Sequence, residues 1–111
     1  MSSERVDRFS QLVHQHPDNV LFRFSLAQAL EAAGRTDEAR RQYETCCAAK
    51  PDWMMPRILL GKSLVAAGQT AAAREMLASA LALAIAQDHE EPERELRGLL
   101  ADLPVADSER P

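Results

Sequence analysis

One stretch of the sequence occurs twice at a fixed distance. Residues 32–40 read AAGRTDEAR, and residues 66–74, which begin 34 residues later, read AAGQTAAAR. A repeat period of this length is typical of stacked two-helix units, each of which buries the apolar face of its neighbour. The period therefore predicts an all-α solenoid, and it indicates that the protein acts by binding something.

The repeat extends well beyond this stretch. Residues 17–50 and 51–84 align without gaps and are identical at twelve positions, namely Pro, Asp, Arg, Leu, Leu, Ala, Ala, Gly, Thr, Ala, Arg and Ala. The same register places Phe9 at the position of Tyr43, so we expect residues 3–16 to form the second half of an incomplete repeat. The half unit, the two full units and a closing helix approach the three units that a solenoid needs for stability.

Helix boundaries follow from apolar periodicity and from residues that break helices. Pro17 and Pro51 are expected to end helices, and Gly34 and Gly68 are expected to do so in a left-handed conformation. No proline stands at Ile85, so the helix there should run on to about residue 87. Three residues are expected to cap helices with their side chains: Asp18, Thr36 and Thr70. The first three expected helices span residues 3–16, 19–33 and 37–49. The fourth begins near 54–56 and ends at Gly68, the fifth follows Thr70 and runs to about 87, and the sixth spans residues 92–103.

Length and composition fit one helical domain. The chain has 111 residues, and only 5% of them are aromatic. A core built mainly from leucine and alanine favours closely packed helices over a β-sandwich, which needs more β-branched and aromatic residues. We expect a single helical domain over residues 1–104, followed by a flexible tail over residues 105–111.

Charge and cysteine content narrow the classes of partner. The net charge is −4, whereas surfaces that bind nucleic acid normally carry a basic excess, so no nucleic-acid partner is expected. The sequence shows no apolar leader and no apolar run long enough to cross a bilayer, so no membrane partner is expected. The adjacent Cys46 and Cys47 provide no disulfide framework, which favours a cytoplasmic location.

Residues of defined size recur at matching positions of both units. In the first unit they are Leu26, Ala27, Leu30, Gly34, Ala39, Tyr43, Cys46 and Pro51. In the second unit they are Leu60, Gly61, Leu64, Gly68, Ala73, Leu77 and Ala80. This pattern resembles the tetratricopeptide repeat (TPR) family. The resemblance implies a right-handed α-solenoid of antiparallel helix pairs, with about two full units, an N-terminal half repeat and a C-terminal capping helix.

The small residues of the pattern have a packing role. Ala27 and Ala39 in one unit, and Gly61 and Ala73 in the other, are expected where the two helices of a unit approach closely. The chain departs from the family pattern at Arg23 and at its counterpart in the second unit, Arg57, because the family usually has a bulky aromatic there.

The resemblance also implies a concave surface lined by the first helix of each unit. Proteins of this fold are typically interaction scaffolds, so the expected function is a protein-interaction module that binds a peptide or helix of a partner protein in that groove. The expected groove residues are Leu21, Phe24, Gln28, Glu31, Met55, Ile58, Lys62 and Val65. Some of these residues could instead belong to the core or be covered by the C-terminal helix.

The sequence offers little catalytic chemistry. His14 and His16 are two residues apart and point in different directions, so no metal site is expected. Cys46 and Cys47 stand at packing positions and are expected to be buried structural thiols. No nucleophile pair, phosphate-binding loop or pair of inward carboxylates can be made out, so we expect no enzyme and no cofactor. One subset of the family grips a C-terminal carboxylate, but the corresponding positions here are Phe24, Gln28 and Leu59.

A second hypothesis belongs to a different class of function. A short solenoid leaves apolar ends, through which two copies could form a homodimer, and the protein would then be a structural self-assembly module. The residues expected at these ends are Val6, Phe9, Val13, Leu96, Leu99 and Leu103.

Overall fold

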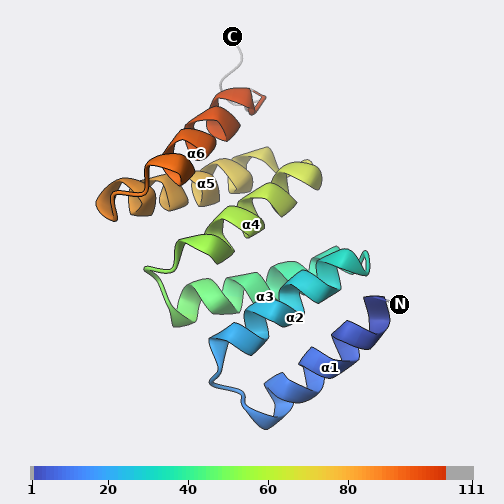
Figure 1. Ribbon diagram of the computed structural model, residues 1–111. Coiled ribbons are helices and arrows are strands. Elements are labelled where there is room, and N and C mark those ends of the chain that lie inside the picture. Colours follow the sequence, from blue (N-terminus) through green and yellow to red (C-terminus); the bar gives the residue numbers. More distant parts are fainter. Residues whose placement is uncertain (1, 105–111) are drawn as a thin grey trace. The chain divides into compact units, whose positions relative to one another are not determined.

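A computed structural model of the protein describes residues 2–104 (Figure 1). These residues form six α-helices and no β-strand, which confirms the all-α prediction. The predicted tail, residues 105–111, lies outside the described residues. The helices are α1 (Ser2–Gln15), α2 (Val20–Ala32), α3 (Thr36–Ala49), α4 (Met54–Ala66), α5 (Thr70–Ala86) and α6 (Glu90–Asp102).

Most helix ends lie within two residues of their predicted positions. The helix α5 runs to Ala86, as the absence of a proline at Ile85 predicts. The helix α6 begins at Glu90, two residues before the predicted start at Pro92. Pro92 therefore lies in the first turn, where its missing N–H removes no intrahelical hydrogen bond.

The predicted side-chain caps are wrong. Asn19 rather than Asp18 precedes α2, and its Oδ1 accepts a hydrogen bond from the Phe22 N–H at 3.0 Å. Thr36 and Thr70 are the first helical residues of α3 and α5, because the residues before them occupy the cap positions without a side-chain hydrogen bond. The N–H groups of those preceding residues, Arg35 and Gln69, donate to carbonyls of the previous helix at 2.9 Å and 3.0 Å, and each helix starts one residue earlier than expected.

The helices form two compact units. The first contains α1, α2 and α3, the second contains α4, α5 and α6, and the boundary follows Pro51. In the first unit α2 packs against both α1 and α3, and in the second unit α5 packs against both α4 and α6. The single domain over residues 1–104 stays a prediction.

In the first unit, small residues and one large aromatic residue pack α2 against α3. Ala27 and Ala39 have no exposed surface, as expected for a close approach of α2 and α3. Tyr43 of α3 is fully buried and meets Phe24 edge-on, with ring centroids 5.9 Å apart. Its hydroxyl donates a hydrogen bond to Glu31 Oε1 at 3.0 Å, which ties the end of α2 to the middle of α3.

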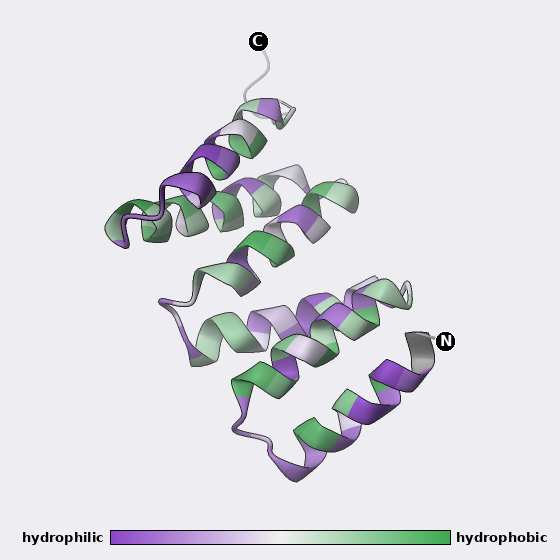
Figure 2. Ribbon diagram, in the orientation of Figure 1, coloured by the Kyte–Doolittle hydropathy of each residue, from purple (hydrophilic) through white to green (hydrophobic). Residues whose placement is uncertain are grey.

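The second unit has its own apolar core. A single cluster of buried residues joins all three helices of the unit, and α5 contributes half of its buried members. Figure 2 shows α5 coloured mainly as hydrophobic, whereas hydrophilic and hydrophobic residues alternate along α6. The buried members are Met54, Ile58, Leu77, Ala80, Ala84 and Leu96, and the half-buried side chains packed on them are Leu81, Leu83, Leu99, Leu100 and Leu103.

Gly61 confirms the predicted close approach of α4 and α5. A Cβ atom at this position would lie 2.7 Å from Cγ of the fully buried Leu77. Such a distance is well inside van der Waals contact, so even alanine would force Leu77 to move. The counterpart in the first unit is Ala27. At this position a methyl group therefore fits between α2 and α3, whereas between α4 and α5 it would collide with Leu77.

The two arginines that depart from the family pattern have equivalent roles. Arg23 of α2 donates a hydrogen bond to Gln42 Oε1 of α3 at 3.1 Å. Arg57 of α4 donates one to Ser79 Oγ of α5 at 3.0 Å. Each arginine joins the two helices of its unit, so a polar link takes the position where the family usually has an aromatic.

The predicted left-handed glycine turns are confirmed. Gly34 has a φ of 80° and Gly68 a φ of 76°. After α2, the Arg35 N–H donates to the Leu30 carbonyl at 2.9 Å and the Gly34 N–H donates to the Glu31 carbonyl at 3.0 Å. This pair of hydrogen bonds satisfies carbonyls at the helix end that would otherwise lack partners.

A third turn of the same kind follows α5 but lacks a glycine. Asp88 has a φ of 57°, and it is the only non-glycine residue with a positive φ within residues 2–104. The hydrogen bonds repeat the pattern, because the His89 N–H donates to the Ala84 carbonyl at 2.9 Å. Aspartate tolerates this conformation better than most residues, but less well than glycine.

Replacement of Gly34 by valine tests the turn. No atom lies within 4 Å of a Cβ built at Gly34, so backbone conformation alone determines the effect. We expect Gly34→Val to lower the free energy of unfolding by about 1–2 kcal/mol, measured by urea denaturation. The control is Gly98→Ala inside α6, where a Cβ also meets nothing within 4 Å, and it should raise stability by about 1 kcal/mol. Unchanged stability of Gly34→Val would contradict the assignment.

Tyr43 makes stability sensitive to alkaline pH. Burial, followed by the hydrogen bond and the charge of Glu31, raises the pKa of Tyr43 well above its usual value of 10.0. A raised folded-state pKa means that the full stability is present below about pH 10 and is lost as pH rises through the folded-state value. We expect Tyr43→Phe to reduce this alkaline loss, measured by circular dichroism.

Absorbance provides an independent check, because Tyr43 is the only tyrosine in the chain. In the folded protein the phenolate should form well above pH 10, and Glu31→Gln should lower the midpoint by removing the adjacent negative charge. The control variant is Glu44→Gln, at an exposed position of α3, which should leave the midpoint unchanged. A wild-type midpoint near 10 would be incompatible with the buried hydroxyl.

Candidate partner-binding site

The four predicted groove residues of the first unit lie along α2. The Leu21 side chain is 64% exposed, and Gln28 is also exposed. Phe24 and Glu31 are half-buried, because both contact Tyr43 of α3. Leu21 and Gln28 are therefore accessible to a partner, while Phe24 and Glu31 also hold the unit together.

The four predicted groove residues of the second unit lie along α4. Met55 is 45% exposed and Val65 is 40% exposed. The Lys62 ammonium forms an ion pair with Glu95 of α6, with 3.4 Å between Nζ and Oε1. Ile58 is only 4% exposed and belongs to the apolar core of the unit, where Leu96 of α6 joins the same cluster.

Three of these α4 residues meet in one pocket. It has a volume of about 300 Å³ and lies between α4 and the N-terminal half of α6. The C-terminal helix therefore forms one wall of the pocket and leaves Met55 and Lys62 exposed. The lining residues are Met55, Ile58, Leu59, Lys62, Glu91, Pro92 and Glu95, and we call this site the α4–α6 pocket.

Sequence reasoning missed the contribution of α6 to this pocket. The last helix was expected to begin at residue 92, yet α6 already begins at Glu90 and so includes Glu91. The signal that could have revealed it was the spacing of Glu91 and Glu95, which places both carboxylates on one face of a helix.

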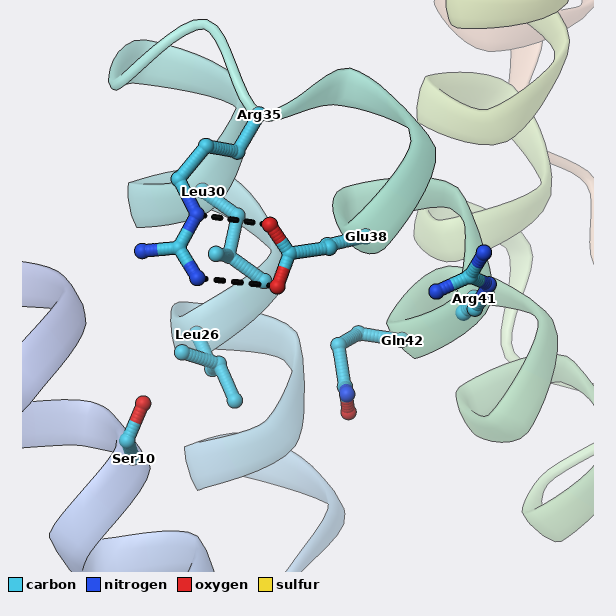
Figure 3. Close-up of a pocket in the computed structure, with 7 residues that line it drawn as sticks. All are labelled: Ser10, Leu26, Leu30, Arg35, Glu38, Arg41 and Gln42. Atoms are coloured by element: carbon cyan, nitrogen blue, oxygen red, sulfur yellow. Dashed lines mark hydrogen bonds and ion pairs between the residues drawn. The ribbon is translucent and has the colours of Figure 1, made fainter.

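A smaller pocket lies in the first unit (Figure 3). Its volume is about 190 Å³, and its walls come from α1, α2, α3 and the turn before α3. The Arg35 guanidinium and the Glu38 carboxylate face each other there, with Nε–Oε2 at 2.6 Å and Nη2–Oε1 at 2.8 Å. The lining residues are Ser10, Leu26, Leu30, Arg35, Glu38, Arg41 and Gln42, and none of them is a predicted groove residue.

The pairing of Arg35 with Glu38 determines how much positive charge the smaller pocket presents. The hydrogen bond from Arg35 lowers the pKa of Glu38, and the hydrogen bond to Glu38 raises the pKa of Arg35, so both groups stay ionised. Their charges cancel at the pocket wall. The pocket therefore offers a partner less basic character than its arginines suggest in the sequence.

The apolar ends expected for self-assembly are used inside the units. Leu96 is fully buried, and Leu99 and Leu103 pack on the core of the second unit. Val6 is also buried, in the helix that packs on α2. Val6 and Leu96 are thus not available at exposed ends, whereas Phe9, Val13, Leu99 and Leu103 are half-buried, and the homodimer stays a hypothesis.

The cysteines have the properties of packing residues. Neither Cys46 nor Cys47 forms a disulfide, both are buried, and burial raises the pKa of Cys46 to about 11. A thiol with such a pKa stays protonated at neutral pH and is a poor nucleophile. Within residues 2–104 no group of three or more His, Cys, Asp or Glu side chains is arranged to hold a metal ion. The helices in this range are all too short or too polar to cross a membrane.

Comparisons with known proteins agree with the helix-pair pattern. Two family models, both described as tetratricopeptide repeat, match residues 6–52 and residues 54–79. Among solved structures, the fold is similar to a structure of yeast Sti1, the complex of its TPR2B domain with pHsp70. The TM-score is 0.78 at 19% sequence identity, and the match covers 86% of this chain and 77% of that one. A search of curated protein sequences found no match.

The matched ranges coincide with the helix pairs. The first range runs from α1 to the end of α3, and the second covers α4 and most of α5. Both contain the left-handed glycine turn and the buried small residues described above. The chain therefore belongs to the tetratricopeptide repeat family of protein-interaction modules.

Proposed function

We propose that the protein binds a peptide or helical segment of a partner protein, with the exposed face of α2 in the first unit and that of α4 in the second unit as its contact surfaces. One observation carries this proposal. Four large apolar side chains are exposed within the described part of the chain, and three of them, Leu21, Met55 and Val65, are predicted groove residues. The fourth is Ile85, near the end of α5, with 48% of its surface exposed.

Exposed apolar side chains on a binding face favour association, because a partner removes them from water. Met55 suits this role, since its flexible and polarisable side chain adapts to different partners. A polar member of the set, Gln28, is exposed and can form hydrogen bonds that orient a ligand. Apolar anchors with a few polar groups are typical of grooves that take helices or extended peptides.

The structural neighbour supports a partner of this class. The TPR2B domain of yeast Sti1 was solved in a complex with pHsp70, so a similar fold holds a protein ligand there. The identity of 19% transfers the fold alone. For the present chain, the choice of α2 and α4 therefore rests on the exposure of Leu21, Met55 and Val65.

Affinity capture with matched variants tests the proposal. The full chain serves as bait in a cell lysate, bound proteins are identified by mass spectrometry, and the affinity of each recovered partner is then measured. We expect the triple variant Leu21→Ala/Met55→Ala/Val65→Ala to weaken binding by at least about tenfold, because apolar anchors dominate interface energies. These side chains are exposed, so the variant should keep its fold, which circular dichroism verifies.

Ile85→Ala is the matched control, because it removes an exposed apolar side chain that is outside the predicted groove set. It should bind each partner as the wild type does. A partner that the triple variant retains and Ile85→Ala loses would place the binding surface elsewhere. Light scattering of the purified chain gives a separate test of the homodimer hypothesis, and a dimer that the triple variant dissociates would assign the exposed faces to self-association.

A further inference from the structure

The negative charge of the chain is concentrated in its second half. Residues 1–51 contain seven acidic and seven basic side chains, whereas residues 52–111 contain ten acidic and six basic ones. The whole net charge of −4 therefore comes from the second half. Half of its acidic side chains lie within residues 88–95, at the start of α6.

Some of this acidity has a local explanation. Carboxylates in the first turn of a helix are stabilised by the helix dipole, and Glu90, Glu91 and Glu93 stand in the first turn of α6. Glu93 is also paired with Arg97, with 3.0 Å between Oε2 and Nη2. Glu91 and Glu95 differ from Glu93 because both line the α4–α6 pocket.

The pocket combines an apolar surface with these two carboxylates. Three α4 residues supply the apolar surface: Ile58 is buried, Leu59 is half-buried, and Met55 is exposed. Lys62 is the one basic residue of the lining, so the pocket carries one negative charge in excess. An apolar side chain of a ligand can lie on Met55 and Leu59, while a cationic group reaches the carboxylates of α6.

We propose that the α4–α6 pocket takes a basic amphipathic segment of a partner protein, with apolar side chains on α4 and lysine or arginine side chains against Glu91 and Glu95. This inference rests on the proposed function and specifies the chemistry of the partner. Charge complementarity selects this occupant, because the acidic half of the chain attracts a basic segment and repels an acidic one. A second copy of the chain, which carries the same net negative charge, is disfavoured on the same ground.

Lys62 acts as an internal competitor for the ligand. Its ion pair with Glu95 spans 3.4 Å, and both side chains are about half exposed. Such a surface pair contributes little to stability, so a lysine or arginine of the ligand can replace Lys62 at the Glu95 carboxylate. Removal of the Lys62 charge should therefore strengthen binding of a basic segment, whereas a merely structural role for Lys62 predicts no gain.

Two designed peptides probe the pocket. Both are short amphipathic helices with the same leucine face, and the polar face carries lysine in one and glutamate in the other. Fluorescence anisotropy measures their binding to the full chain at low and at physiological salt. We expect the lysine peptide to bind at least about tenfold more tightly than the glutamate peptide, and added salt should reduce the difference.

Variants of the full chain locate the interaction. Glu91→Gln/Glu95→Gln should weaken binding of the lysine peptide by about tenfold, and Lys62→Gln should strengthen it by a few fold. Glu75→Gln is the control, because it removes an exposed carboxylate of the same unit outside the pocket lining. It should change the affinity by less than about twofold. All of these positions are exposed, and thermal unfolding checks that each variant stays folded.

The outcomes separate this inference from the proposed function. The inference is overturned if the lysine peptide does not bind, if the glutamate peptide binds as tightly, or if Glu75→Gln matches the effect of the pocket variants. A captured partner that depends on Leu21, Met55 and Val65 but not on Glu91 and Glu95 would leave the proposed function intact and remove only the basic ligand. A captured partner whose binding depends on neither set of residues would contradict both the proposed function and the basic ligand.

Discussion

Helix pairs in this protein approach each other where one side chain is a methyl group or is absent. Ala27 and Ala39 fill this role in the first unit, and Gly61 fills it in the second, where Leu77 occupies the space that a Cβ would need. The close approach brings Leu77 into the core cluster with Ile58. Ile58 is buried in that core, whereas Met55 of the same helix is exposed and lines the pocket together with residues of α6.

The repeat allowed most of the fold to be predicted from the sequence, because each turn and each small residue appears twice. Features that occur once were predicted less well. The turn at Asp88 escaped prediction because aspartate there adopts the conformation that glycine adopts at Gly34 and Gly68. The pocket wall formed by Glu91 and Glu95 was also not predicted. The reason is that α6 has no counterpart in the repeat register, and its position is determined by its packing on α5.

The candidate site could also be predicted only in part, because some of its properties depend on contacts between helices. The family resemblance was enough to name Leu21, Met55 and Val65 as residues that a partner could reach, and all three are exposed. It could not tell whether Ile58 belongs to the core or to a groove, because the answer depends on the helix packed beside it. Electrostatic character was also hidden, since the ion pair of Lys62 with Glu95 joins residues from different helices.

The chain contains one tyrosine and one tryptophan, and they fall in different units. Tyr43 is buried in α3, and Trp53 is the residue that precedes α4. Each half of the molecule thus has its own natural chromophore, so the unfolding of each half can be followed optically in the unmodified protein. Repeat proteins are stabilised by interactions within repeats and between neighbours. Comparison of the two signals would show whether the halves melt together or one after the other, and hence how strongly neighbouring repeats are coupled.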